Sequence, residues 1–150
     1  MKVCFSGTFN VLHKGHKELF DKAFEVAGRK GTVFIGVTKG PISKKKEFTK
    51  PVSKRVKEIK NYLSSEGYND RAVIKIISDR FGPAVSGDYD AIVVSPGSFE
   101  NAQDINKKRV ENKKKPLKII KVPYVLASDG KKISSTRILN KEIDKEGQVL

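Results

Sequence analysis

Apolar and polar residues alternate along this chain in blocks that favour strands and helices in turn. Residues 3–5 form a short apolar run that ends at a Ser-Gly pair, which predicts a buried strand followed by a loop. Between residues 15 and 27 the apolar positions recur at helical spacing, and two glycines end that pattern. Residues 32–37 are apolar on both faces, which is typical of a strand covered from both sides.

The alternation continues to the end of the chain and completes an α/β pattern. The polar, basic residues 38–50 predict a loop, and Pro51 suits the first turn of the helix that follows. The other predicted elements are helices over residues 51–63, 101–112 and 134–140, and strands over residues 72–77, 90–95 and 117–122. Five apolar strands joined by helices predict a single Rossmann-like, doubly wound domain over residues 1–150, with a five-stranded parallel sheet.

This fold determines where a ligand site is expected. In open parallel sheets, ligands bind beyond the carboxyl ends of the strands, at the point where the strand order reverses. That rule brings the loops after the first, fourth and fifth strands into one site. The motifs described next come from those loops.

Composition narrows the class of protein. No apolar run is long enough to span a membrane and the first residues lack a signal-peptide pattern, so we expect a cytoplasmic protein with no membrane partner. The one cysteine, Cys4, excludes an internal disulfide and a cysteine-rich metal site, and its apolar surroundings predict a buried, inert thiol. The formal net charge of +14 indicates anionic partners such as nucleotides, nucleic acid or acidic surfaces, without choosing among them.

The first candidate motif runs from Gly7 to His16, between the first strand and the first helix. A helix start offers free backbone N–H groups and a positive dipole end to phosphates. His13 and His16 are three residues apart, so one helical turn points both imidazoles the same way, where they can donate hydrogen bonds to a phosphate. Gly15 leaves room for a ligand to approach closely. Two histidines placed by chance are one alternative; a zinc site is another, disfavoured because no cysteine lies nearby.

The second candidate motif runs from Gly130 to Ile138 and repeats this design near the other end of the chain. Ser134, Ser135 and Thr136 stand at a predicted helix start, where hydroxyls either cap backbone N–H groups or bind phosphate oxygens. Arg137 can form forked hydrogen bonds with a β- or γ-phosphate. A well-capped helix without any ligand explains the same residues equally well.

The two motifs together resemble the nucleotidyltransferase superfamily of HxGH enzymes. The resemblance is carried by the run Gly7-Thr8-Phe9-Asn10, by His13-Lys14-Gly15-His16 and by Ile133-Ser134-Ser135-Thr136-Arg137-Ile138. Class I aminoacyl-tRNA synthetases are distant relatives, but they carry a KMSKS-type second motif that this chain lacks.

Four further segments resemble the archaeal-type phosphopantetheine adenylyltransferases, and the likeness covers nearly the whole chain. They span residues 81–84, 89–96, 105–109 and 129–138. The adenylyltransferase part of the eukaryotic bifunctional coenzyme A synthase is similar. This resemblance implies transfer of AMP from ATP to 4′-phosphopantetheine, which gives dephospho-coenzyme A and pyrophosphate, with Mg²⁺ entering with ATP and no metal site on the protein.

The resemblance also implies roles for individual residues. Thr8 orients the incoming phosphate, His16 stabilises the transition state, and the loop lysines Lys45 and Lys46 neutralise charge around the transferred group. The acceptor is bound by Thr8, Lys44, Asp79 and Tyr89. ATP is bound by Gly7, Thr8, Phe9, His13, Gly15, His16, Ser95, Asn106, Arg109, Ser134, Ser135, Thr136 and Arg137.

The chain departs from the family pattern at two points. It has Gly7 alone where many relatives have a glycine pair, and Asn10 where an acidic residue is common. An acidic residue at that position is often supposed to have a metal-linked role, and an asparagine there would weaken it.

Several alternatives stay open on the sequence alone. Another transferase of the superfamily, such as a cytidylyltransferase or an NMN or FMN adenylyltransferase, fits the same two motifs. The charge of +14 suggests a non-catalytic nucleic-acid-binding protein, although charge describes association rather than chemistry. A regulatory nucleotide-binding domain is disfavoured because binding alone does not need both His13 and His16. We do not expect nucleic acid as a partner, and the oligomeric state is a monomer or a small homo-oligomer.

Overall fold

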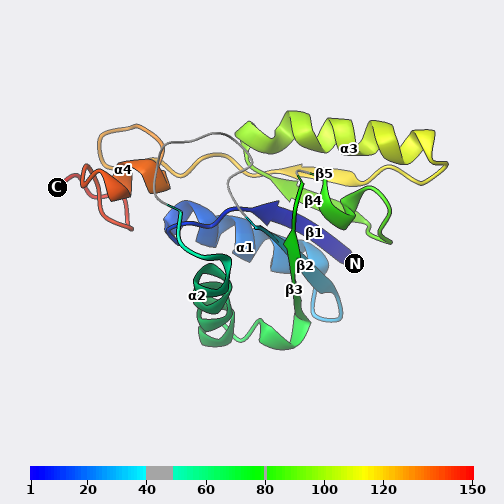
Figure 1. Cartoon of the computed structure of the whole chain (residues 1–150), viewed down its shortest axis with the longest axis horizontal. Helices are drawn as coiled ribbons and strands as arrows, with labels where there is room; N and C mark the ends of the chain where they lie inside the picture. Colours follow the sequence, from blue (N-terminus) through cyan, green and yellow to red (C-terminus); the bar gives the residue numbers. More distant parts are fainter. Residues whose placement is uncertain (40–48, 80) are drawn as a thin grey trace.

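A computed structural model describes residues 1–39, 49–79 and 81–150 of the chain. Its centre is a sheet of five parallel strands in the order β3-β2-β1-β4-β5 (Figure 1). The strands are β1 (Lys2–Gly7), β2 (Thr32–Thr38), β3 (Ala72–Ile77), β4 (Ala91–Val94) and β5 (Lys118–Lys121). The predicted fold class, a doubly wound α/β domain with a five-stranded parallel sheet, is confirmed.

Helices cover both faces of the sheet. The first two α-helices lie on one face and the third lies on the other, alongside β5 (Figure 1). The α-helices are α1 (Lys14–Ala27), α2 (Val52–Ser65), α3 (Phe99–Glu111) and α4 (Ser135–Leu139), and three short 3₁₀ helices are η1 (Asn69–Arg71), η2 (Gly82–Ala84) and η3 (Pro96–Ser98). Every predicted strand and helix is present, and its ends lie within about two residues of the predicted ones.

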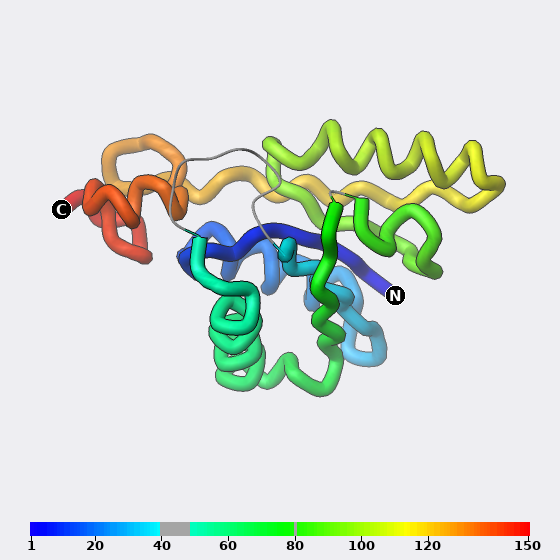
Figure 2. Tube along the Cα trace, in the orientation of Figure 1, coloured from blue at the N-terminus to red at the C-terminus, as the bar shows by residue number. Residues whose placement is uncertain are grey.

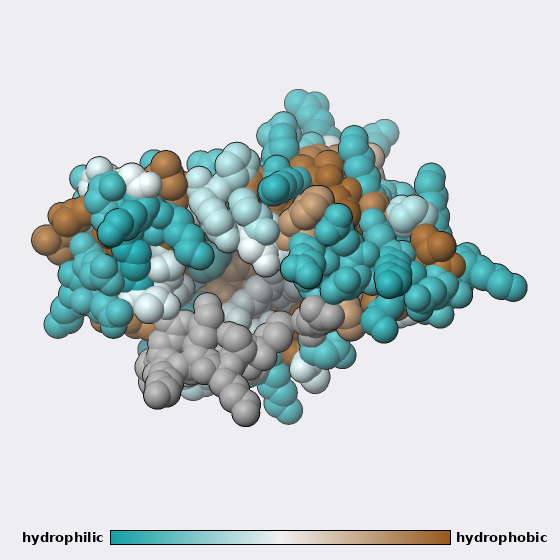
Figure 3. Space-filling model, turned by 90° about the horizontal axis from the view of Figure 1, so that it is seen from above, coloured by the Kyte–Doolittle hydropathy of each residue, from teal (hydrophilic) through white to brown (hydrophobic). Residues whose placement is uncertain are grey.

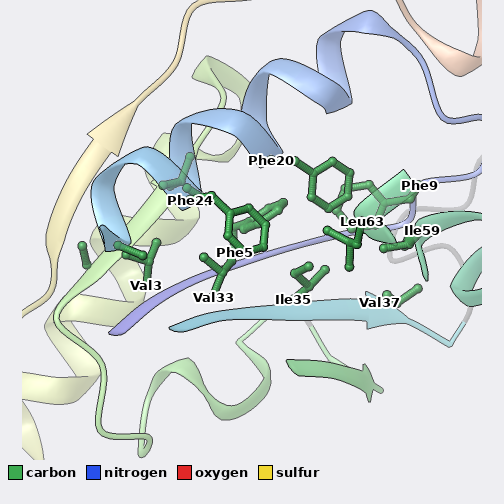
Figure 4. Packing of buried hydrophobic residues seen from close by; sticks show 14 residues of the cluster. Val3, Phe5, Phe9, Phe20, Phe24, Val33, Ile35, Val37, Ile59 and Leu63 are labelled. Carbon is green, nitrogen blue, oxygen red and sulfur yellow. The ribbon is translucent and has the colours of Figure 1, made fainter. Parts of the chain in front are cut away.

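The larger core lies between the sheet and the helices α1 and α2. Alternate residues of β1, Val3 and Phe5, point into it, because successive side chains of a strand face opposite sides. Phe20 and Phe24 of α1 pack onto them at helical spacing (Figure 4). Figure 4 shows these side chains filling the space between α1 and the first two strands.

A smaller core lies on the opposite face, beneath α3. Cys4, which stands between Val3 and Phe5, points into this side together with Ile92 of β4 and Ile105 of α3. Burial raises the pKa of the Cys4 thiol to about 12, so the thiol stays protonated at neutral pH. The prediction that Cys4 is buried is confirmed, and a thiol that stays protonated is expected to be a poor nucleophile.

The strand order reverses between β1 and β4. The chain builds outward from β1 through β2 to β3 and then returns to place β4 on the other side of β1. The carboxyl ends of β1, β4 and β5 therefore meet at one end of the sheet, where a ligand crevice is expected. The C-terminal segment with α4 lies at this same end, whereas the N-terminus lies at the opposite end of the molecule (Figure 2).

Among the described residues, no helix has the length and the apolar character needed to cross a membrane.

Candidate active site

A pocket of about 520 Å³ lies where the strand order reverses. In Figure 3 the surface is hollowed between the C-terminal part of the molecule, on the left, and the remainder on the right. The two sequence motifs, which are more than 110 residues apart, line this hollow together with the ends of β4 and β5. The described lining residues are Ser6, Gly7, Thr8, Phe9, Asn10, His13, Gly15, His16, Leu19, Thr49, Ser95, Gly97, Ser98, Val122, Pro123, Tyr124, Val125, Lys132, Ile133, Ser134, Ser135 and Thr136.

The loop after β1 is held in place by a buried aromatic side chain. Phe9 has a φ of 52°, in the left-handed region, and its ring is only 3% exposed. The ring stacks on Phe20 and meets the His16 ring edge to face at 5.1 Å. A Cβ at Gly7 would come within 3.0 Å of this ring, which explains the glycine at that position. Phe9 thus anchors the loop in the core and contributes little of its side chain to the pocket.

His13 caps the helix that follows the loop. Its Nδ1 accepts hydrogen bonds from the backbone N–H groups of Gly15 and His16, at 3.0 and 3.4 Å. Because Nδ1 accepts, the neutral ring carries its proton on Nε2, which is left as a donor. A Cβ at Gly15 would meet the His13 ring at 2.9 Å, so in this structure the glycine makes room for the cap rather than for a ligand.

His16 lies against His13 in a stacked pair. The two ring centroids are 3.8 Å apart and the planes are inclined by 18°. Burial first, and the neighbouring His13 ring second, lower the pKa of His16 to about 3, although the nearby Val11 backbone acts in the opposite direction. Burial lowers the pKa of His13 to about 4. Both imidazoles are therefore neutral near pH 7 and act as hydrogen-bonding groups rather than as cations.

The Nδ1 atom of His16 is buried and has no hydrogen-bond partner in the described part of the chain. Buried polar atoms are usually paired, because an unpaired one costs about 1–3 kcal/mol. An unpaired nitrogen in a residue that lines a pocket marks a place where a ligand or water supplies the partner.

The serine motif is tied directly to the first loop. Ser135 Oγ accepts a hydrogen bond from the Val11 N–H at 3.3 Å and donates one to the Val11 carbonyl at 3.4 Å. Ser134 Oγ accepts from the Arg137 N–H at 3.2 Å and so caps α4. Thr136 lines the pocket beside them. The structure thus brings the predicted residues of both motifs, with the exception of Arg137, to one pocket.

Arg137 is turned away from that pocket. Its guanidinium forms an ion pair with Asp129 and donates to the carbonyl of Lys132 at 3.0 Å. The hydrogen bond from Arg137 lowers the pKa of the Asp129 carboxyl. The guanidinium that was predicted to form two hydrogen bonds with a phosphate therefore binds the Asp129 carboxylate in this structure.

The predicted nucleotide contacts on α3 are corrected by the structure. Arg109 is 4% exposed, and its guanidinium donates to the carbonyls of Ala84, Gly87 and Lys115 at 2.8 Å each. Asn106 exchanges two hydrogen bonds with the backbone of Leu117. Neither residue lines the pocket, because both use their polar groups to join α3 to neighbouring backbone.

A second, smaller cavity of about 30 Å³ lies beside the first, on the α3 face of the sheet. Its walls are mainly apolar and include Ile77, Phe81 and the predicted acceptor residue Tyr89, and Ser6 lines both cavities. Asp79, the other acceptor candidate beyond β3, instead accepts hydrogen bonds from the backbone N–H groups of Phe81 and Gly82 at 2.9 and 2.7 Å. Asp79 therefore shapes the turn that closes this cavity and does not line it.

Of the remaining predicted residues, one lines the pocket and three lie outside the described part of the chain. Ser95 lies at the end of β4 and lines the large pocket, as expected for a residue that borders a nucleotide. Lys44, Lys45 and Lys46 lie outside the described residues.

The structure also shows pocket residues that the sequence did not single out. Tyr124 lies at the mouth near Gly97, and Lys132 lies over its ring at 4.7 Å from the centroid. Asn10 is 5% exposed and its Oδ1 accepts from the Lys50 N–H at 2.8 Å, so this departure from the family pattern serves as an anchor for the chain before α2. Lys132 lies within the second motif but was given no role there, and Tyr124 carries no local pattern that could have marked it in advance.

The described lining is rich in hydroxyl groups, amide groups and imidazole rings but contains no carboxylate. The described residues also hold no cluster of three or more histidine, cysteine or acidic side chains suited to a metal ion. Hydroxyls, backbone N–H groups and neutral imidazoles are donors to phosphate oxygens. The pocket can therefore hold a polyphosphate and stabilise charge that develops on it.

Comparison with known proteins covers nearly the whole chain. A family profile described as Cytidylyltransferase-like matches residues 4–141. The chain is 40% identical over 149 residues to a phosphopantetheine adenylyltransferase of Methanosarcina mazei, covering 99% of this chain and 96% of that protein. It is 38% identical over 151 residues to the protein of the same name from Archaeoglobus fulgidus, covering 100% of each chain.

A solved structure is similar as well. The chain superposes on the crystal structure of a protein of unknown function from Archaeoglobus fulgidus with a TM-score of 0.72 and 35% sequence identity. The superposition covers 81% of this chain and 89% of that chain. The fold described above is therefore similar to one that has been observed experimentally.

Proposed function

The chain belongs to the cytidylyltransferase-like family and, within it, to the group of archaeal phosphopantetheine adenylyltransferases, and we propose that it transfers AMP from ATP to 4′-phosphopantetheine. The products are dephospho-coenzyme A and pyrophosphate. Both substrates are intracellular metabolites, so we place this reaction in the cytoplasm.

One observation carries the proposal: the two motifs meet in one pocket and are hydrogen-bonded to each other through Ser135 and Val11. In a nucleotidyl transfer the triphosphate must be bound at more than one point, so that the α-phosphorus is oriented for in-line attack by the acceptor. The imidazoles of the first motif and the hydroxyls of Ser134 and Thr136 line the same pocket.

The chemistry requires alignment and charge stabilisation more than proton transfer. The attacking group is an oxygen of the acceptor phosphate, which is already anionic near neutral pH. As it bonds to the α-phosphorus, the bond to the pyrophosphate breaks and negative charge builds on the phosphoryl oxygens. The neutral rings of His13 and His16 are suited to donate hydrogen bonds to that charge, and the Thr8 hydroxyl is suited to orient the acceptor phosphate.

Mg²⁺ is proposed to arrive as part of the substrate, MgATP. The described lining supplies hydroxyl and amide oxygens but no carboxylate, so most of the ligands of the ion would be phosphate oxygens and water. Mg²⁺ keeps several waters and is commonly bound through substrate phosphates. This donor set fits an ion that enters and leaves with the nucleotide.

The acceptor is proposed to extend from Thr8 toward the smaller apolar cavity. Ser6 lines both cavities, and the walls of the smaller one, including Tyr89 and Phe81, suit contact with part of the uncharged arm of phosphopantetheine, since a cavity of about 30 Å³ cannot enclose the whole arm. The phosphate end would then lie beside Thr8, and the lysines predicted to neutralise it are Lys44, Lys45 and Lys46.

The competing transferases differ in base and acceptor, so one assay separates them. Pyrophosphate release is measured with ATP or CTP in combination with 4′-phosphopantetheine, NMN, FMN and a phosphorylated alcohol. We expect release only with ATP and 4′-phosphopantetheine. Preferential use of CTP, or of another acceptor, would replace the proposed function with that of another member of the family.

A further inference from the structure

Arg55 is a buried cation that none of the motifs includes. It lies in the first turn of α2 and is 1% exposed. Burial of a charge is costly, and a cation near a helix N-terminus also opposes the helix dipole. Burial accordingly lowers the pKa of the Arg55 guanidinium. A residue kept in such a position must make contacts that outweigh these costs.

The guanidinium of Arg55 donates to four backbone carbonyls that come from three separate segments. Nη1 donates to the carbonyls of Thr8 and Thr38, at 2.8 and 2.7 Å. Nε donates to the carbonyl of Lys50 at 2.8 Å, and Nη2 donates to that of Lys39 at 3.2 Å. Four of its five N–H groups are thus used, and all four of these bonds go to backbone carbonyls.

Thr8 is held by this arrangement from two directions. Its carbonyl is fixed by Arg55, and its hydroxyl accepts a hydrogen bond from the Thr38 hydroxyl at 3.1 Å. Thr38 itself is held by the same Nη1 atom. The direction in which the Thr8 hydroxyl points into the pocket therefore depends on Arg55, which does not line the pocket itself.

We propose that Arg55 is a positioning residue for adenylyl transfer, which acts by fixing Thr8 at the floor of the pocket. The proposal rests on the function proposed above, because it concerns the same reaction. A guanidinium is suited to this task since its donors lie in a rigid plane and reach several segments at once. A lysine at position 55 keeps the charge but has one nitrogen, which cannot hold four carbonyls in three segments.

The test is a double-mutant cycle on Arg55→Lys and Thr8→Val, with kcat and KM measured on protein that is shown to be folded by circular dichroism. We expect Arg55→Lys to lower kcat between about tenfold and a hundredfold, the size of effect that misalignment of about 1 Å produces. The KM for ATP should change by less than about threefold, because most of the ATP contacts lie elsewhere. The double variant should lose no more than Thr8→Val alone, since Arg55 acts through Thr8.

Arg71→Lys is the matched control. Arg71 also donates to a backbone carbonyl, that of Gly28 at 2.6 Å, but this residue precedes β3 at the opposite end of the strands. The Arg71→Lys variant should have a lower melting temperature than the wild type but the same kcat. If Arg55→Lys does not fold, Arg55→Gln is measured in the same cycle.

The positioning role would be overturned if Arg55→Lys had the kcat of the wild type. It would also be overturned if the reduction of kcat in the double variant equalled the product of the reductions in the two single variants. An inactive wild-type protein would instead count against the proposed function, so the two failures can be told apart.

Discussion

The two histidines of the first loop have different hydrogen-bonding partners, and this difference separates their roles. His13 uses Nδ1 to cap α1, so one of its nitrogens is fully occupied by structure. His16 has a buried Nδ1 without a partner in the described part of the chain. A cap contributes mainly to stability, whereas His16 lines the pocket and caps no backbone group with its side chain. His16 is therefore the residue on which catalysis is expected to depend more strongly.

Replacement of His16 by alanine tests this assignment. Loss of one donor to developing charge typically costs about 2.7–4 kcal/mol, which corresponds to a fall in kcat of about 10²–10³. The melting temperature should fall as well, because the variant also removes a ring that stacks on His13 and meets Phe9, so kcat is measured on protein shown to be folded. Steady-state kinetics and thermal unfolding of His16→Ala give both quantities, and Glu18→Ala, an exposed position on the same helix, is the control. Ordinary turnover in His16→Ala would remove this residue from the mechanism.

The buried imidazoles also predict how stability depends on pH. The pKa of His13 is about 4 in the folded protein, against about 6.5 for an unfolded chain. Between these two values the unfolded protein binds more protons, so stability is retained above pH 6.5 and is lost as the pH falls toward 4. For His13 the loss between pH 7 and pH 5 is roughly 2 kcal/mol.

Urea unfolding at the two pH values measures this loss, and His13→Asn is the matched variant because asparagine also caps helices but does not titrate. The wild type should lose roughly 2 kcal/mol more than His13→Asn on acidification. Equal losses would show that the His13 ring is protonated in the folded protein.

At the scale of elements, arginine side chains connect helices to loops near both cavities. Arg55 connects α2 to the large pocket, and Arg109 connects α3 to the turn between Ala84 and Gly87, beside the smaller cavity. Each guanidinium donates to several backbone carbonyls in loops or at the ends of strands and helices. The rigidity of both cavities therefore depends on side chains that face away from them.

Arg109→Met distinguishes this structural role from the nucleotide contact expected from family resemblance. Methionine keeps the apolar stem but leaves buried carbonyls without donors, which costs about 1–3 kcal/mol of unfolding free energy. The KM for ATP should stay near the wild-type value, and any rise should fall on the KM for the acceptor. Urea unfolding and substrate titrations give these quantities. A large rise in the KM for ATP with unchanged stability would restore Arg109 to the nucleotide site.

The sequence was sufficient to predict the helices and strands and the two motifs that line the pocket. Apolar periodicity is set by the two-sided burial of strands and the one-sided burial of helices, so β3 was predicted at its observed bounds, Ala72–Ile77. Ser135 and His16 were predicted because strand order brings their loops together. Arg109 was misplaced because a family motif records which residue is present and not which way its side chain points. Arg55 was missed because a basic residue in a mixed-charge helix resembles a solvated one.

At the scale of the whole molecule, the fold joins the two ends of the chain into one catalytic pocket. The link between Val11 and Ser135 spans 124 positions in sequence. A positive molecule, with a net charge of +14, attracts substrates that both carry several negative charges. Charge, strand order and motif placement thus favour the same reaction, in which one anion attacks another within a pocket that supplies hydrogen-bond donors.

The central claim is that the acceptor phosphate attacks the α-phosphorus of ATP. The most direct measurement incubates the protein with 4′-phosphopantetheine, Mg²⁺ and ATP labelled at either the α- or the γ-phosphorus, and then separates the products. We expect the α-label to appear in dephospho-coenzyme A and the γ-label in pyrophosphate. A γ-label on the acceptor, or no labelled product with active, folded protein, would contradict it.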